Sequence, residues 1–212
     1  MFLRAILSII LTVMLISPYA AAAGYQDLLD SPSSKGKLAA TKLLNGVTLA
    51  GKRLIGVGQR GHIVFSEDQG KIWVQADVPV RSDLVAVHFP TAVNGWAVGH
   101  DGVVLHSGDG GGRWTRQLDG RAAAQVMVDY YKENAPKSRT GEGPSSQDIS
   151  AEVKRYLEQG PDKPFLDVWF ENETTGYIVG AFNLIFRTGD GGKSWVPLFD
   201  KIDNPKRFHL YA

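Results

Sequence analysis

The stretch RTGDGGKSW, residues 187–195, places an aspartate among glycines directly before a tryptophan. Two earlier stretches repeat its spacing: FSEDQGKIW at residues 65–73 and HSGDGGGRW at residues 106–114. We call the shared pattern, Ser/Thr-x-Asp-x-Gly-x-x-Trp, the Asp box. A phosphate-binding glycine loop leads into a helix whose N-terminal amides face the anion. Each tryptophan here precedes a few strand-like residues and a turn, so the box is one part of a repeat.

The match between copies extends well upstream of the boxes. VHFPTAVNGWAVGHDGVVLHSGDGGGRW (residues 87–114) aligns without a gap on VWFENETTGYIVGAFNLIFRTGDGGKSW (residues 168–195), at an offset of 81. The copy at residues 47–73 precedes the second by 41. Each unit contains four short strand patterns separated by turn residues, and Gly61, Gly102 and Asn183 occupy the turn between strands two and three. A four-stranded unit repeating at about 40 residues predicts an all-β fold, the blades of a β-propeller.

The box has a structural interpretation within such a blade. In the turn between strands three and four, the Asp and Ser side chains can accept hydrogen bonds from backbone amides, and Gly supplies the conformation that other residues resist. We expect each tryptophan to bury its ring between neighbouring sheets. The predicted structural residues are Ser66, Asp68, Gly70, Trp73, Ser107, Asp109, Gly111, Trp114, Thr188, Asp190, Gly192 and Trp195.

The N-terminus resembles a secretory signal peptide. Arg4 precedes an apolar run at residues 5–16, followed by Pro18 and a stretch of small residues, which predicts cleavage near Ala22 or Ala23. The alternative is a retained N-terminal anchor, although the run is shorter than the roughly 20 residues of a membrane span. The sequence contains no cysteine, which excludes a lipid-modified cysteine and disulfides. We expect an exported protein, periplasmic or in an equivalent lumenal compartment.

The repeats predict the division of the chain. The last residues resemble the opening strand of another unit. We expect a fragment of a longer protein, because an unfinished repeat leaves unpaired strand edges; the alternatives are a strand that closes onto a partner copy and an open arc. The expected parts are a signal peptide (1–23), a linker (24–42), the first blade (43–81), the second blade (82–120), an insertion (121–164), the third blade (165–204) and the start of a further blade (205–212).

The insertion has a helical pattern instead of a degenerate blade. Apolar residues recur at helical spacing in RAAAQVMVDYYKEN (residues 121–134) and QDISAEVKRYLEQ (residues 147–159). The segment between them is rich in Pro, Gly and Ser, which predicts a flexible connection. Two roles stay open for this helical hairpin, a capping or spacer element and a docking arm for a partner.

Charge gives a weaker indication of partners. The formal net charge of +1 does not favour nucleic acid as a partner. Cations gather in the first two blades, and a basic patch there would bind an acidic partner or lipid headgroups; the alternative is an ordinary solvated rim. The candidate binding residues are Arg53, Arg60, Arg81, Arg113 and Arg116.

The sequence gives little support for an enzyme. Asp boxes also occur in sialidases, which need an arginine cluster, a Tyr–Glu pair and an Asp acid. The Tyr and Glu neighbours here, Tyr130, Tyr131 and Glu133, fall in the helical insertion. His88, His100 and His106 share one blade, but no second group of ligands at metal spacing accompanies them. We expect no catalytic residues, no metal and no cofactor.

The export signal, the early unit GKRLIGVGQRGHIVFSEDQGKIW, and the GWAVG and GYIVG units that end in SGDGGGRW and TGDGGKSW together resemble the photosystem II stability and assembly factor family and its bacterial relatives. The resemblance covers roughly residues 43–120 and 165–212. It implies a non-enzymatic, seven-bladed propeller outside the cytoplasm that docks on membrane complexes during their assembly and binds a reaction-centre subunit precursor. The partner expected on this basis is a membrane protein or a subunit of a membrane complex, with possible association with the membrane surface. The alternative is a glycan-binding or sialidase-like glycoside hydrolase module.

Overall fold

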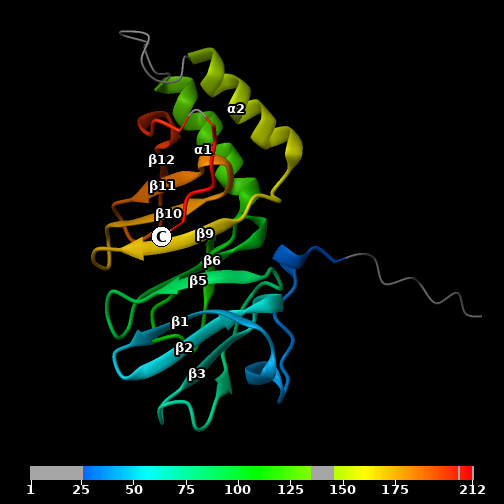
Figure 1. Ribbon diagram of the computed structural model, residues 1–212, viewed down its shortest axis with the longest axis vertical. Helices are drawn as coiled ribbons and strands as arrows, with labels where there is room; N and C mark the ends of the chain where they lie inside the picture. The colour runs from blue at the N-terminus through cyan, green and yellow to red at the C-terminus, as the bar shows by residue number, and fades with distance from the viewer. Residues whose placement is uncertain (1–25, 135–145, 205, 212) are drawn as a thin grey trace, which may run out of the picture.

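The computed structural model describes residues 26–134, 146–204 and 206–211, and contains three four-stranded antiparallel sheets there (Figure 1). In every sheet the strands lie in sequence order. The first sheet contains β1 (Leu44–Ala50), β2 (Arg53–Gly58), β3 (Ile63–Ser66) and β4 (Val74–Gln75). The second contains β5 (Leu84–His88), β6 (Gly95–Gly99), β7 (Val104–Ser107) and β8 (Thr115–Leu118). The third contains β9 (Phe165–Phe170), β10 (Gly176–Gly180), β11 (Ile185–Thr188) and β12 (Val196–Pro197). This confirms the predicted all-β fold, with propeller blades of four strands.

The turn between the second and third strands is the same in all three sheets. Two successive residues have positive φ in each turn, and short 3-10 turns mark these positions: η3 (Gln59–Gly61), η4 (His100–Gly102) and η5 (Ala181–Asn183). Gly61, Gly102 and Asn183 have φ of 68°, 62° and 70°, as their residue types favour. At Gly61 a Cβ would also collide with the carbonyl oxygen of Val80.

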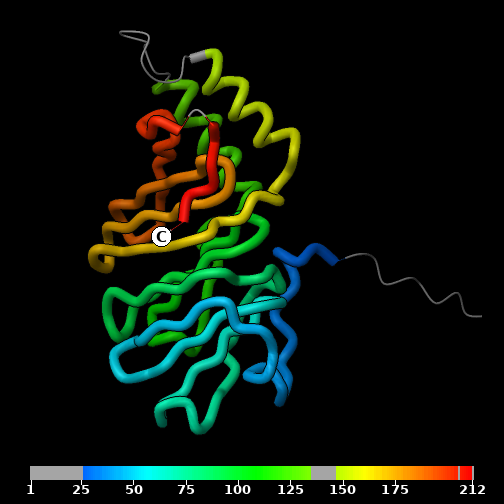
Figure 2. The backbone as a smooth tube through the Cα atoms, viewed as in Figure 1, coloured from blue at the N-terminus to red at the C-terminus, as the bar shows by residue number. Residues whose placement is uncertain are grey.

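The sheets stack through their faces, with the first strands β1, β5 and β9 adjacent (Figure 2). One buried cluster joins the first and second sheets and includes Ile55, Leu84 and Trp114. A second joins the second and third sheets, where Trp96 stacks on Phe170 with ring centroids 3.6 Å apart and planes 8° apart. Adjacent repeats therefore supply each other's core.

The insertion forms two helices, α1 (Gly120–Glu133) and α2 (Ser146–Gln159), as predicted. Asp119 caps α1 by accepting hydrogen bonds from the amides of Arg121 and Ala122. α1 contacts both η4 of the second sheet and β12 of the third. The apolar side chains of both helices, Ala123, Met127, Tyr131, Ile149, Val153 and Tyr156, are buried in the cluster that joins these sheets. The hairpin thus completes a core, while most of its predicted flexible connection, residues 135–145, lies outside the described residues.

The segment before β1 packs along the first sheet. It contains two short turns, η1 (Leu28–Asp30) and η2 (Ala39–Thr41). The Ser33 amide donates to the Val78 carbonyl at 3.0 Å and the Arg81 amide donates to the Leu28 carbonyl at 2.8 Å. The predicted signal peptide lies outside the described residues. Within the described ranges, no helix has the length and apolar character needed to cross a membrane.

The chain after β12 continues through η6 (Phe199–Lys201). Residues 206–211 are not assigned as a strand. Their backbone instead bonds to the η5 turn, because the Asn183 amide donates to the Phe208 carbonyl at 3.2 Å and the Leu210 amide donates to the Gly180 carbonyl at 2.9 Å. Ala212, the last residue of the expected opening strand, lies outside the described residues.

Candidate functional site

The Asp-box carboxylates are occupied by their own turns. In the second box, Asp109 Oδ1 accepts from the Ser107 hydroxyl at 2.9 Å and from the amides of Gly112 and Arg113 at 2.9 and 3.0 Å. The Gly111 amide donates to Ser107 Oγ at 2.9 Å. The other two boxes have the same pattern. In the first box, Asp68 accepts from the Ser66 hydroxyl and the Ile72 amide, and the Gly70 amide donates to Ser66. In the third box, Asp190 accepts from the Thr188 hydroxyl and from the Ser194 amide and hydroxyl, and the Gly192 amide donates to Thr188.

These hydrogen bonds stabilise the ionised carboxylates. The pKa of Asp190 lies below its ordinary value, chiefly because the Ser194 hydroxyl donates to it. Burial raises the pKa of Asp109, but the donors of its turn together outweigh burial and lower it. A general acid at neutral pH needs a raised pKa, so these aspartates have the environment of structural acceptors.

The box tryptophans of the second and third sheets are buried in the clusters that join each sheet to the one before it. Trp114 is 3% exposed and meets Phe89 of its own repeat edge-on, with ring centroids 5.7 Å apart. Trp195 is buried and meets Phe170 of its own repeat in the same way at 6.2 Å. Trp73 is only half-buried. No described sheet precedes its own, and residues 35–40 line the hollow beside its ring instead.

Two side chains connect a box to the sheet before it. The Arg53 guanidinium of the first sheet donates to the carbonyls of Asp109 and Gly110 at 3.3 and 2.7 Å. The side-chain amide of Gln117, in the second sheet, donates to the Gly191 carbonyl at 2.9 Å. The boxes therefore contribute to contacts between blades as well as to their own turns.

The five candidate arginines do not all face solvent as free cations. Arg53 pairs with Glu67 at 2.5 Å, and Arg116 pairs with Asp30 at 3.3 Å and Asp119 at 3.6 Å. Arg60 and Arg113 are exposed, and Arg81 is half-buried. Asp30 comes from the segment before β1 and also pairs with Arg121 at 3.1 Å. The basic patch of Arg53, Arg60, Arg81, Arg113 and Arg116 stays a prediction.

The three histidines of the second blade have different surroundings. His88 Nδ1 accepts from the Phe170 amide at 3.1 Å, and His106 Nε2 lies 3.1 Å from Asn94 Oδ1. Burial lowers the pKa of both imidazoles, which favours their neutral forms. His100 is exposed in η4. Among the described residues, no group of three or more His, Cys, Asp or Glu side chains is placed to hold a metal ion.

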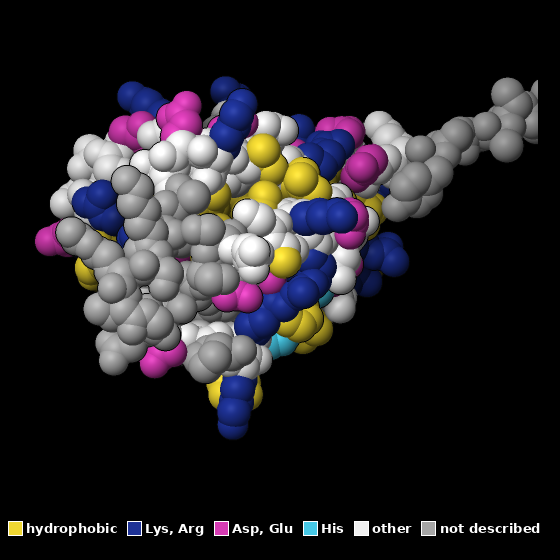
Figure 3. Space-filling view, turned by 90° about the horizontal axis from the view of Figure 1, so that it is seen from above, with side chains coloured by type: hydrophobic (Ala, Val, Ile, Leu, Met, Phe, Trp, Pro, Cys, Tyr) yellow, Lys and Arg dark blue, Asp and Glu magenta, His cyan; other side chains and the backbone are white. Residues whose placement is uncertain are grey.

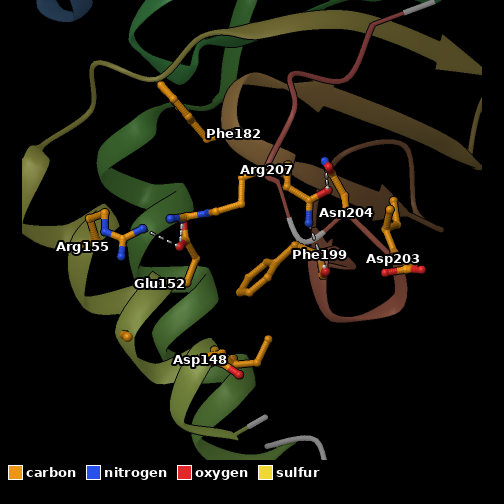
Figure 4. A pocket seen from close by; sticks show the side chains of 12 residues that line it. Asp148, Glu152, Arg155, Phe182, Phe199, Asp203, Asn204 and Arg207 are labelled. Atoms are coloured by element: carbon orange, nitrogen blue, oxygen red, sulfur yellow. Dashed lines mark hydrogen bonds and ion pairs between the residues drawn. The ribbon is translucent and has the colours of Figure 1, made fainter. Parts of the chain in front are cut away.

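A cavity of about 480 Å³ lies between α2, η5 and the segment after β12 (Figure 4). Sequence reasoning missed it, because its walls come from three separate segments. The ring of Phe199 points toward α2 in this view. The lining residues are Asp148, Ile149, Ala151, Glu152, Arg155, Phe182, Asn183, Phe199, Ile202, Asp203, Asn204 and Arg207.

The cavity combines buried apolar side chains with a charged rim. Ile149 and Phe199 are buried, whereas Phe182 is 47% exposed. Glu152 pairs with Arg155 at 3.1 Å and with Arg207 from the opposite wall. The cavity therefore suits a ligand with both apolar and polar groups. On the face of the molecule seen from above (Figure 3), basic and acidic side chains are interspersed around a small group of hydrophobic ones.

Phe182 and Arg207, which both line this cavity, have positive φ, and the value for Arg207 is 56°. The φ of Phe182 is 55°, a region that costs a residue with a Cβ roughly 1–2 kcal/mol. The equivalent positions hold Arg60 and Asp101, with φ of 54° and 57°. The conformation therefore belongs to the repeat, and what distinguishes the third turn is the exposed aromatic ring of Phe182.

The sheets, boxes and turns together define an Asp-box β-propeller protein. Comparison with models of protein families finds no match, and comparison with curated proteins finds none. Among solved structures, the chain is similar to "YCF48 bound to D1 peptide" (17% identity, TM-score 0.47) and to YCF48 from Cyanidioschyzon merolae (19%, 0.46). These matches cover 73% and 74% of this chain and 40% of each of those chains.

A GH74 enzyme from Niastella koreensis is also similar, at 14% identity and a TM-score of 0.45, over 73% of this chain and 22% of the enzyme. The chain thus spans less than half the length of each of these structures. With TM-scores below 0.5, the matches add no argument about activity to what the strands and boxes show.

Proposed function

We propose that this chain is a non-enzymatic scaffold that acts outside the cytoplasm and holds a segment of a partner protein in the cavity beside α2. The observation that carries the proposal is the cavity itself, which has buried apolar residues, an exposed Phe182 and a Glu152 carboxylate shared by two arginines. Its volume of about 480 Å³ falls within the range of ligand sites. The rigid sheets and the packed hairpin hold the walls in place, which reduces the ordering cost of binding.

The proposed partner is a membrane protein or a subunit of a membrane complex, whose assembly or stability the scaffold assists. The signal-peptide pattern and the resemblance of the repeat motifs to assembly factors support this part of the proposal. The hairpin then has both roles considered from the sequence, because it completes a core and lines the cavity.

A glycan-binding or glycoside hydrolase module is the second candidate. The exposed ring of Trp169 beside Tyr177 favours it, because sugars and other flat apolar surfaces pack on such rings. The occupied box aspartates do not add catalytic groups to this alternative.

Site-specific photocrosslinking in native cells tests the scaffold. A photoreactive residue at Ala151, on the cavity wall, should capture one dominant membrane protein, and the same residue at exposed Lys71 in the first box should not. Phe182→Asn removes the ring but keeps a residue type that tolerates positive φ, so capture should fall by about tenfold.

Asp101→Asn is the matched control in the equivalent turn of the second sheet, and it should leave capture unchanged. Equal crosslinking from Ala151 and Lys71, or retention of glycans in place of a protein, would contradict the proposal.

A further inference from the structure

We call the segment before β1, residues 26–43, the strap, and it lies beside the first sheet (Figure 1). The Gly36 amide donates to Gln75 Oε1 at 2.9 Å, and the Gln75 side-chain amide donates to the Ser34 carbonyl at 3.0 Å. The Lys35 ammonium donates to the Gln75 carbonyl at 3.0 Å. All three bonds are exposed to solvent, which is typical of a segment that opens locally at a small free-energy cost.

His62 lies where the strap contacts the turn between the second and third strands of the first sheet. It is 9% exposed, and its Nδ1 is buried without a hydrogen-bond partner among the described residues. The residues just before it bond to the strap, because Ser33 Oγ donates to the Arg60 carbonyl at 3.0 Å and the Gln59 amide donates to the Leu43 carbonyl at 3.2 Å. The strap therefore keeps an ionisable ring away from water.

The other two described blades have an apolar side chain at this position. Val103 follows His62 by 41 residues, and Leu184 follows Val103 by 81. Val103 is 0% and Leu184 4% exposed. All three residues directly follow the tight turn, and each amide donates to the carbonyl three residues before it. The position thus suits a buried apolar side chain, and in the first blade it holds an ionisable one.

The charges around His62 oppose its protonation. Arg60 from its own turn and Lys42 from the strap are both cations, and no carboxylate of the described residues is among the groups that act on the ring. Burial and then these two cations hold the pKa of His62 below its ordinary value, although a backbone contact from Ser34 acts in the opposite direction. The closed strap therefore favours the neutral imidazole.

Other charged groups of the strap contact form ion pairs. Asp30 pairs with Arg116 at 3.3 Å and Arg121 at 3.1 Å, and Lys35 pairs with Asp77 at 2.7 Å. Hydrogen bonds from these cations hold the pKa of both carboxylates below its ordinary value. Histidine is the side chain that ordinarily titrates between about pH 5 and pH 8, which makes His62 the group of this contact that responds to mild acid.

We propose that His62 is a pH-sensitive switch that releases the strap when the surroundings become mildly acidic. Protonation adds a third cation beside Arg60 and Lys42 in a site without a carboxylate, and opening lets the charged ring reach water. A base with a lowered pKa in the closed state stabilises that state above its ordinary pKa of about 6.5 and opposes it as the pH falls below that value. Between about pH 7.5 and about pH 5.5, one such proton raises the ratio of open to closed strap by up to about tenfold.

Release changes the surface that the strap covers. It uncovers the apolar side chain of Leu29, which is 2% exposed, and it separates Asp30 from Arg116 and Arg121. The switch thus couples pH to the exposure of an apolar site and of two cations. It uses no residue of the cavity beside α2 and does not depend on the proposed partner.

Thiol labelling measures the opening of the strap, because the sequence has no cysteine of its own. Ser31 is 2% exposed, so the thiol in Ser31→Cys reacts with a dipyridyl disulfide only when the strap opens. A peptide of residues 26–36 with the same substitution gives the rate of the free thiol at each pH. We expect the rate relative to the peptide to be low at about pH 7.5 and to rise several-fold, up to about tenfold, at about pH 5.5.

Two substitutions of the histidine, made in the Ser31→Cys protein, test its role. His62→Val has the residue type of the second blade, and His62→Gln has a neutral polar side chain of similar size. Both should label slowly at either pH. His100→Gln, which changes an exposed histidine in the equivalent turn of the second blade, should keep the full response to pH. Far-UV circular dichroism checks the fold of each variant.

Three outcomes would overturn the inference. The first is a relative labelling rate that is the same at both pH values in the Ser31→Cys protein. The second is a pH response that persists in His62→Val or His62→Gln. The third is labelling as fast as the peptide at about pH 7.5, which would show that the strap is already open.

Discussion

Truncation of the buried box tryptophan tests the packing between blades. Trp114 is 3% exposed in the cluster that joins the first and second sheets. Within its own repeat it meets Phe89 edge-on and donates from Nε1 to the Gly111 carbonyl at 3.0 Å. A tryptophan buries about 150–250 Å², which corresponds to about 4–6 kcal/mol at about 25 cal/mol per Å². This is an upper bound, because the unfolded chain also buries part of that surface. We therefore expect Trp114→Ala to lower the free energy of unfolding by about 3–5 kcal/mol.

The same box in the first sheet provides an internal control. Trp73 is half-buried, beside residues 35–40 instead of a sheet, so Trp73→Ala should cost about 1–2 kcal/mol. Urea unfolding followed by far-UV circular dichroism measures both variants. With a slope of about 2 kcal/mol per molar, the midpoint should fall by about 1.5–2.5 M for Trp114→Ala and by less than about 1 M for Trp73→Ala. Equal shifts would refute the conclusion that packing on the preceding sheet, and not the box alone, gives the tryptophan its effect.

Two further predictions concern carboxylates. Asp119→Ala removes the cap of α1 and should lower stability by about 1–2 kcal/mol in urea unfolding, while Asp119→Ser, which restores a capping oxygen, should recover most of it; no difference between the two would argue against the cap. The pKa of Asp190 is lowered in the fold by the Ser194 hydroxyl, so its ionised form adds stability above about pH 4, and this contribution is lost as the pH falls through the folded pKa. The stability gap between wild type and Asp190→Asn should accordingly be largest at pH 7 and shrink below pH 4, and a gap that does not change with pH would contradict this origin.

Sequence patterns within single blades and helices predict most of the fold. The spacing of the boxes and the positions of Gly61, Gly102 and Asn183 depend on turns within one blade, and the structure has strands and turns at the predicted places. The two helices of the insertion follow from their apolar periodicity. These features depend on neighbours in sequence, which is why a single chain predicts them.

Contacts between distant segments could not be predicted in this way. Nothing in the sequence pattern indicates that Asp30 pairs with Arg116 and Arg121, 86 and 91 residues away. The position of residues 35–40 beside Trp73 and the convergence of three segments on the cavity are set by tertiary packing. Charge clustering in sequence likewise does not show that Arg53 and Arg116 pair with carboxylates, and the basic patch stays a prediction.

The hydrogen bonds from Arg53 to the second box and from Gln117 to the third both run from one sheet to the box of the next sheet along the chain. The row of sheets therefore has a direction. The second and third boxes each accept a hydrogen bond from the unit that precedes them, and the donor comes from a different strand each time, β2 in one case and β8 in the other. The units are therefore not interchangeable parts. A duplicated unit would need a neighbour on its N-terminal side that had already acquired a suitable donor, so growth of such an array by gene duplication is constrained by order as well as by length.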